Sequence, residues 1–176
     1  MKILDLGCGN RKYKSENKED KVIGVDTEVN SQADIIHDLN KYPYPFQDNE
    51  FDVIYSSHCL EHLDNVFDFM KEVHRILKSK GKLIIKVPHF SSATSFASLH
   101  HKHYFGCRTF TTSFNEYFEV EKIKLHYCYL TDKWYKKIIN SIMSSLANLN
   151  TYFCERFWCY WVGGFSQIHV ELKNKK

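Results

Sequence analysis

The stretch Ile3-Leu4-Asp5-Leu6-Gly7-Cys8-Gly9-Asn10, together with Val22-Ile23-Gly24-Val25-Asp26, decides how the rest of this chain is interpreted. The first part is a short apolar run that breaks at two glycines, and the second is an apolar run that ends on a carboxylate. This pattern is typical of a parallel α/β sheet that holds a nucleoside. Glycines let backbone N–H groups approach the ligand, and the acid accepts the two ribose hydroxyls.

The glycine loop also indicates which nucleoside is bound. A dinucleotide-binding loop follows G-x-G-x-x-G, but the third glycine position here is Lys12. Asp5 lies two residues before Gly7. A buried carboxylate there would repel a pyrophosphate but attract a ligand that carries an ammonium and a sulfonium group. The loop therefore favours S-adenosylmethionine as the cofactor.

Four motifs resemble a known family in their order along the chain: LDLGCGN, VIGVD, HDLNKYPYPFQDNEFDVIYSSHCLEHL and HRILKSKGKLIIKVPHF. They are similar to class I S-adenosylmethionine-dependent methyltransferases, and most of all to the small type-11-like members found in surface-polysaccharide gene clusters. The resemblance weakens after Tyr104. It implies an α/β, Rossmann-like fold with a seven-stranded, mostly parallel sheet whose last strand is antiparallel.

The length of the chain predicts one domain over residues 1–176. Hydrophobic spacing and composition predict a helical, aromatic insertion at 131–164 before the last strand. Residues 10–21 are mostly charged and offer only Tyr13 to a core, so the first helix of the fold is expected to be reduced or absent. The predicted strands are 2–6, 22–25, 33–36, 51–55, 82–87, 118–126 and 165–172, and the predicted helices are 64–81 and 133–151.

The cysteine pattern, the N-terminal residues and the net charge bear on the compartment and on the kind of partner. The six cysteines contain no C-x-x-C pair, and the first residues run directly into a strand, which leaves no room for a signal peptide. We therefore expect reduced thiols in a cytoplasmic protein. The net charge of +3 gives no strong nucleic-acid signal.

The resemblance assigns roles around the cofactor. It implies Asp5, Gly7, Cys8, Gly9 and Asn10 around the methionine part, and Asp26 on the ribose. Further along the chain it implies Asp38 and Leu39 at the adenine, with Ser56, Ser57 and His58 beneath the reacting methyl group. Asp38 could instead only cap a turn, since Asn40 follows closely, but the motif favours the cofactor role.

An alcohol acceptor must lose a proton during methyl transfer, and histidine suits that task near neutral pH. His101 with Tyr104 and Phe105 matches an H-x-x-F-F pattern that related small methyltransferases carry on the substrate side. We predict His101 as the base and His58 as a second catalytic residue, whereas His62 is interpreted as structural. No metal site is expected, because adjacent His100 and His101 point apart and no zinc-like spacing follows.

Residues 134–162, which begin with Trp134 and end with Val162, leave two interpretations open. Their helical spacing favours a cover that fills the core over the sheet and cleft. Alternatively, their aromatic side chains and flanking lysines suit peripheral contact with a membrane, a lipid-linked substrate or a second subunit.

The predicted function is methyl transfer to a small-molecule or sugar acceptor, on a hydroxyl. One alternative is an RNA or protein methyltransferase, although the acids among the lysines of residues 10–21 dilute any docking face. The other alternative is a degenerate protein that binds S-adenosylmethionine without catalysis. The intact set of Asp5, Gly7, Gly9 and Asp26 counts against it.

Overall fold

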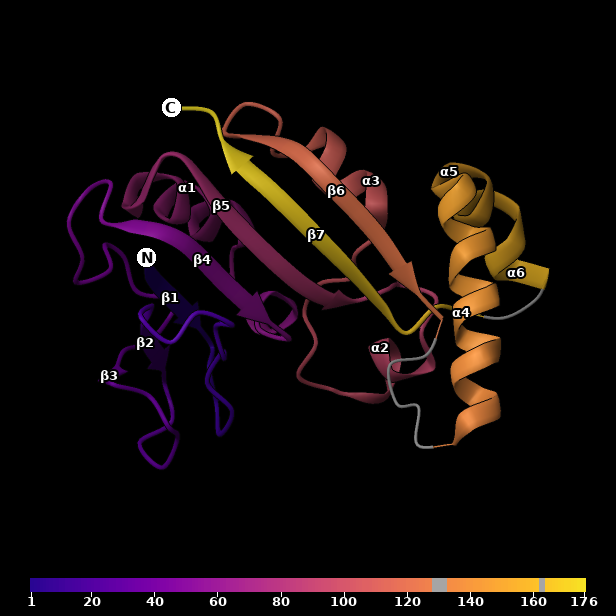
Figure 1. The fold of residues 1–176 in the computed structure, drawn as a ribbon, viewed down its shortest axis with the longest axis horizontal. Helices are drawn as coiled ribbons and strands as arrows, with labels where there is room; N and C mark the ends of the chain where they lie inside the picture. Colours follow the sequence, from indigo (N-terminus) through magenta and orange to yellow (C-terminus); the bar gives the residue numbers. More distant parts are fainter. Residues whose placement is uncertain (128–132, 162–163) are drawn as a thin grey trace.

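The computed structural model describes residues 1–127, 133–161 and 164–176, and their strands form one seven-stranded sheet in the order β3-β2-β1-β4-β5-β7-β6 (Figure 1). The strands β1 to β5 pair in parallel, whereas β7 runs antiparallel to both β5 and β6. The α/β fold with an antiparallel last strand is confirmed. The strands are β1 Lys2–Leu6, β2 Lys21–Asp26, β3 Ile35–Ile36, β4 Phe51–Ser57, β5 Leu77–Pro88, β6 Phe118–His126 and β7 Gln167–Asn174.

Helices α1 (Val66–Ile76) and α3 (Cys107–Thr112) pack against the sheet and close the core. Asn65 begins α1, because its side chain accepts hydrogen bonds from the amides of Phe67 and Asp68. The helix ends at Ile76 rather than near Gly81, since Leu77 already pairs with Phe51 and extends β5 backwards. The remaining short helices are η1 Leu60–His62, α2 Ala93–Ala97, α5 Thr151–Phe153, the π-helical turn η2 Cys154–Trp158 and α6 Cys159–Trp161.

No helix connects β1 to β2 in the described chain, as the charge of residues 10–21 predicts. A loop takes its place. Tyr13 of this loop packs its ring 4.5 Å from the ring of Tyr55, and its amide donates a 2.6 Å hydrogen bond to Asp5. The loop therefore covers the face of β1 that a helix would otherwise bury.

The strands β5 and β7 separate an apolar face from a polar one. Leu83, Ile85 and Val87 are fully buried, while Lys82 and Lys86 alternate with them on the other face. This alternation is the pattern of a sheet that has its core on one side only.

Helix α4 (Trp134–Leu149) lies beside the edge strand β6. Its polar side chains make the contact. Asn148 exchanges two 2.8 Å hydrogen bonds with the backbone of Leu125, and the Ser144 hydroxyl accepts one from the amide of Tyr127. These bonds satisfy the open edge of β6. Of the residues of α4, only Ala147 is buried, so the expectation that this helix fills the core is wrong.

Among residues 1–127, 133–161 and 164–176, no helix has the length and apolar character needed to cross a bilayer. Residues 131–132 and 162–163 of the predicted insertion lie outside the described residues.

Candidate functional site

The turn after β1 has a shape that only glycine accepts easily. Gly7 and Gly9 have φ of 78° and 49°. A Cβ on Gly7 would lie 2.7 Å from Cβ of Cys59, which is closer than real contacts allow. The amides of Gly7 and Cys8 both donate to the carbonyl of Val25, at 2.9 and 3.2 Å, and so fix the turn to the end of β2.

Asp26 ends β2 beside this turn. One carboxylate oxygen accepts a 2.7 Å hydrogen bond from the amide of Gly9, and the other accepts a 3.0 Å bond from the amide of Glu28. Each oxygen keeps a further lone pair. The carboxylate is therefore held in a fixed orientation and can still accept hydrogen bonds from a ligand.

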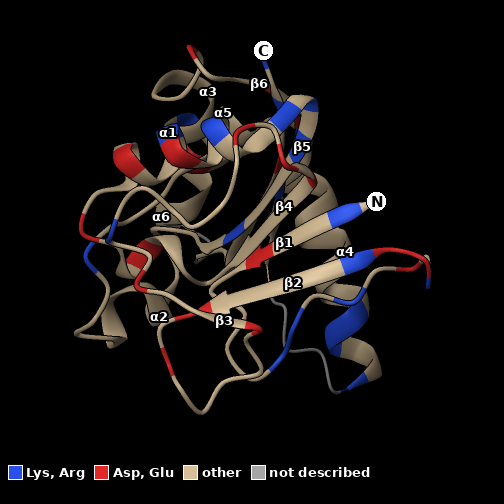
Figure 2. Cartoon of the chain, turned by 90° about the vertical axis from the view of Figure 1, so that its left-hand side faces the viewer, with Lys and Arg blue, Asp and Glu red and all other residues tan. Residues whose placement is uncertain are grey.

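A cleft of about 480 Å³ opens at the carboxyl ends of the parallel strands, where α/β sheets bind ligands. Figure 2 shows acidic segments at these ends of β1 and β2. Of the predicted cofactor residues, Gly7, Gly9, Asp26, Asp38, Leu39 and His58 line the cleft. Its remaining lining residues are Thr27, Glu28, Asn40, Cys59, His62, Leu63 and His100.

A second hollow of about 490 Å³ shares Gly7 with this cleft and contains the predicted residues Asp5, Cys8, Asn10 and Ser57. Asp5 is 1% exposed. Burial raises the pKa of Asp5 to about 6, although the hydrogen bond from the amide of Tyr13 acts in the opposite direction. Burial also raises the pKa of the Cys8 thiol to about 11, so this thiol is protonated near neutral pH.

Two predicted residues have structural contacts of their own. Asp38 caps its turn, because its carboxylate accepts a 3.0 Å hydrogen bond from the amide of Asn40, and it also lines the cleft. Ser56 is fully buried, lines neither cavity, and donates a 3.0 Å hydrogen bond to the carbonyl of Leu6. Ser56 therefore supports the pairing of β1 with β4, and its role beneath the reacting methyl group stays a prediction.

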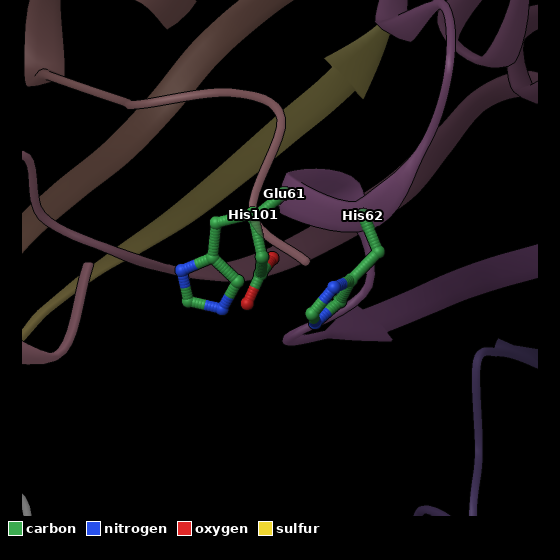
Figure 3. A group of neighbouring side chains, drawn as sticks. All are labelled: Glu61, His62 and His101. Atoms are coloured by element: carbon green, nitrogen blue, oxygen red, sulfur yellow. The ribbon is translucent and has the colours of Figure 1, made fainter. Parts of the chain in front are cut away.

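Of the two predicted catalytic histidines, only His58 lines the cleft, and His101 lies next to the lining residue His62. His58 lines the cleft, has a φ of 54°, and lies with Nδ1 3.2 Å from a carboxylate oxygen of Glu61. His101 lies beside Glu61 and His62, with its ring centroid 4.8 Å from that of His62 (Figure 3). Non-glycine residues in the left-handed region often occur at functional sites.

Other histidines have different surroundings. His89 is fully buried, with Nε2 3.1 Å from Glu155, and Nε2 of His103 lies 3.0 Å from the carbonyl of Leu63.

Sequence reasoning missed Glu61 as a site residue, and also Thr27, Glu28 and Cys59. One signal was available, because Glu61 is a charged residue between the apolar Leu60 and Leu63. It is 1% exposed.

Comparison with known proteins agrees with this geometry. A family model described as "Methyltransferase domain" matches residues 4–85. An uncharacterised protein of Methanocaldococcus jannaschii is 34% identical over 96 residues, which are 48% of this chain and 40% of that protein. Phosphoethanolamine N-methyltransferase 3 of Arabidopsis thaliana is 33% identical over 102 residues, which are 48% of this chain and 20% of that protein. The chain thus spans well under two thirds of these relatives.

Among solved structures, a SAM-dependent methyltransferase from Archaeoglobus fulgidus superimposes with a TM-score of 0.62 at 18% sequence identity. The alignment covers 98% of this chain and 85% of that one. The fold is therefore the Rossmann-like fold of class I methyltransferases.

Proposed function

We propose that this chain, which has the fold of S-adenosylmethionine-dependent methyltransferases, binds that cofactor and transfers its methyl group to a hydroxyl of a small molecule or sugar. The observation that carries the proposal is the acidic cleft around Gly7 and Gly9, with Asp26 and Asp38 in its wall and Asp5 in the adjoining hollow. Carboxylates attract the ammonium and sulfonium groups of S-adenosylmethionine, whereas they would repel the phosphates of a dinucleotide.

The reaction needs little from the protein beyond alignment and a proton acceptor. The leaving thioether is neutral, so the main task is to hold the acceptor in line with the methyl group. His101 and His58 are the proposed proton acceptors. Nδ1 of His101 donates to the carbonyl of Ser95 at 2.9 Å, which leaves Nε2 with a lone pair for a proton.

The acceptor is tested by incubating the full chain with methyl-labelled S-adenosylmethionine and separate pools of sugars, small amines, RNA and protein. We expect label in the hydroxyl-bearing small molecules. We also expect the His101→Ala variant to lose about 100-fold or more in rate, because general base catalysis contributes roughly that much. The His126→Ala variant, which removes an imidazole at the end of β6 that lines neither cavity of the cofactor site, serves as the control.

Each other outcome decides against part of the proposal. Label in RNA or protein would favour that class of methyltransferase, and label in amines would move the acceptor atom to nitrogen. Cofactor binding without transfer to any pool would favour a binding protein.

We propose the cytoplasm as the compartment of the reaction, because the five described cysteines are all free and buried and reduced thiols are usual there.

A partner surface belongs to the same proposal. Large apolar side chains project from α4, α5, η2 and α6, and we call this set the α4–α6 surface: Trp134, Ile138, Ile139, Ile142, Leu146, Leu149, Tyr152, Phe153, Phe157, Tyr160 and Trp161, each at least 43% exposed. Helix α4 turns its polar stripe to β6 and its apolar stripe to solvent. Isolated exposed apolar residues are ordinary, but a contiguous surface of this kind indicates an interaction.

We infer that the α4–α6 surface binds an anionic membrane. Helix α4 contains Lys136 and Lys137, follows Lys133 and carries no acid, as Figure 2 illustrates. A hollow of about 200 Å³ beside the aromatic residues is lined by Arg108 and Arg156, with the single acid Glu155. Aromatic residues with flanking cations are the composition of helices that lie in the lipid headgroup region.

Vesicle flotation tests the membrane contact. We expect the wild-type chain to float with vesicles of anionic phospholipid, and the Ile138→Glu/Ile142→Glu variant to bind at least about 30-fold more weakly, since both side chains are half exposed and apolar. The Val29→Glu/Leu99→Glu variant makes the same kind of change at exposed apolar positions outside the surface and should float normally. A wild-type dimer that the first variant dissociates, with no flotation, would replace the membrane by a second copy of the chain.

A further inference from the structure

Three ligand-type side chains converge where two segments of the chain meet. Glu61 and His62 belong to η1, directly after β4, and His101 belongs to the loop after α2. The segments are tied together, because the amides of Lys102 and His103 both donate to the carbonyl of Glu61, at 2.7 and 3.3 Å. In Figure 3 the carboxylate of Glu61 extends toward the space between the two imidazole rings. One ligand atom from each residue lies within 4.8 Å of the other two.

Backbone carbonyls determine which ring nitrogens of His62 and His101 carry a proton. Nδ1 of His62 lies 3.2 Å from the carbonyl of His100, and Nδ1 of His101 lies 2.9 Å from the carbonyl of Ser95. A carbonyl oxygen only accepts hydrogen bonds, so each Nδ1 must donate, and each neutral ring keeps its lone pair on Nε2. Metal-binding histidines have this arrangement, in which one nitrogen donates to a carbonyl and the other ligates the ion.

Glu61 supplies a charge that its surroundings do not fully satisfy. The residue is 1% exposed, and one of its carboxylate oxygens lies 3.2 Å from Nδ1 of His58. The other oxygen, Oε2, is buried and has no hydrogen-bond partner among the described residues. A buried carboxylate oxygen costs free energy unless a hydrogen bond or a cation compensates it.

We propose that Glu61, His62 and His101 bind a divalent transition-metal ion of the zinc type. Two imidazoles and one carboxylate are a ligand set of catalytic zinc, whereas magnesium and calcium prefer oxygen ligands alone. Zinc bonds of about 2.1 Å place ligand atoms about 3.4 Å apart, so small side-chain rotations would close the site. His62 also lines the cofactor cleft, so the remaining coordination position would face the cleft.

The metal site deepens the proposed function and rests on it for its role in the reaction. A metal-bound hydroxyl loses its proton more readily, because the ion stabilises the alkoxide. In methyl transfer, the acceptor O–H bond would break and its proton would pass to His58, since Nε2 of His101 is then occupied. The oxygen would form the new bond to the methyl carbon while the carbon–sulfur bond breaks and the neutral thioether leaves.

Cobalt provides a direct test that does not depend on activity. We expect the full chain, after treatment with a chelator, to bind one equivalent of Co²⁺ with visible absorption of low-coordinate cobalt, and Zn²⁺ to displace it. Glu61→Gln and His62→Ala should each weaken Zn²⁺ binding by at least about 100-fold, since the loss of mere outer-shell partners already costs 10- to 100-fold. His126→Ala removes an imidazole at the end of β6, outside the group and outside both cavities, and should bind as the wild type does.

The outcomes separate the metal site from the cofactor site. Absence of the cobalt spectrum, or equal binding by the His62→Ala and His126→Ala variants, would overturn the metal site. Thermal stabilisation by S-adenosylmethionine is measured on the same samples without metal. If S-adenosylmethionine stabilises both the wild type and Glu61→Gln, the methyltransferase proposal stands whether or not cobalt binds. If S-adenosylmethionine gives no stabilisation but the cobalt spectrum is normal, only the proposed function is overturned.

Discussion

The Asp26→Ala variant is expected to lose the thermal stabilisation that S-adenosylmethionine gives to the wild-type protein. A ligand at about a hundred times its dissociation constant stabilises a protein by about 2.7 kcal/mol. Asp26 is held by the amides of Gly9 and Glu28, and we propose that its remaining lone pairs accept the two ribose hydroxyls. Each hydrogen bond to a charged group contributes about 1.5–3 kcal/mol, so the loss of two predicts an affinity lower by roughly 10²- to 10⁴-fold.

The matched control for this variant is Asp34→Ala. Asp34 also follows β2 closely and accepts a backbone hydrogen bond, at 2.7 Å from the amide of Gly24, but it lines neither cavity of the cofactor site. We expect this variant to be stabilised by S-adenosylmethionine as the wild type is. A normal thermal shift in Asp26→Ala, measured by calorimetry over a range of ligand concentrations, would show that the ribose does not lie against Asp26.

The parts of the fold that sequence reasoning predicted are those encoded over a few neighbouring residues. The strand–glycine–strand pattern predicted the turn at Gly7 and the carboxylate at Asp26, because short-range backbone geometry decides both. The lack of apolar residues in residues 10–21 predicted the missing helix for the same reason. The cofactor roles of these residues stay predictions until binding is measured.

The parts of the fold that sequence reasoning did not predict depend on which distant segments of the chain meet. Helical periodicity identified α4, but it cannot say which stripe of a helix faces the sheet. Here the polar stripe does, because Asn148 and Ser144 satisfy the open edge of β6. Spacing also argued against a metal at the histidine run. The structure instead brings His101 to Glu61 and His62, about 40 residues earlier in the chain, which no local spacing rule can find.

The largest stability effect is expected from Glu155→Ala. Glu155, in η2, accepts one hydrogen bond from the amide of Cys107, at the start of α3, and its carboxylate lies 3.1 Å from Nε2 of the fully buried His89. It therefore connects the α5–α6 region to the end of β5 and to α3. Removal of the carboxylate leaves two buried donors, the Cys107 amide and Nε2 of His89, without their acceptor, and each such loss costs about 1–3 kcal/mol. Chemical denaturation of Glu155→Ala should give a loss of this size, whereas the exposed Glu119→Ala should change stability little.

The pH dependence of stability provides an independent check on this pair. Burial acts to raise the pKa of Glu155, but the hydrogen bonds from His89 and from the amide of Cys107 outweigh it and hold that pKa below its usual value of 4.5. A carboxyl group with a lowered folded pKa stabilises the protein above its unfolded pKa, and this contribution is lost as the pH falls through the folded pKa. The stability difference between wild type and Glu155→Ala should therefore be full at neutral pH and shrink below about pH 4.5. A difference that stays constant down to pH 3, in denaturation curves taken at each pH, would mean that packing of the side chain, rather than its charge, connects these elements.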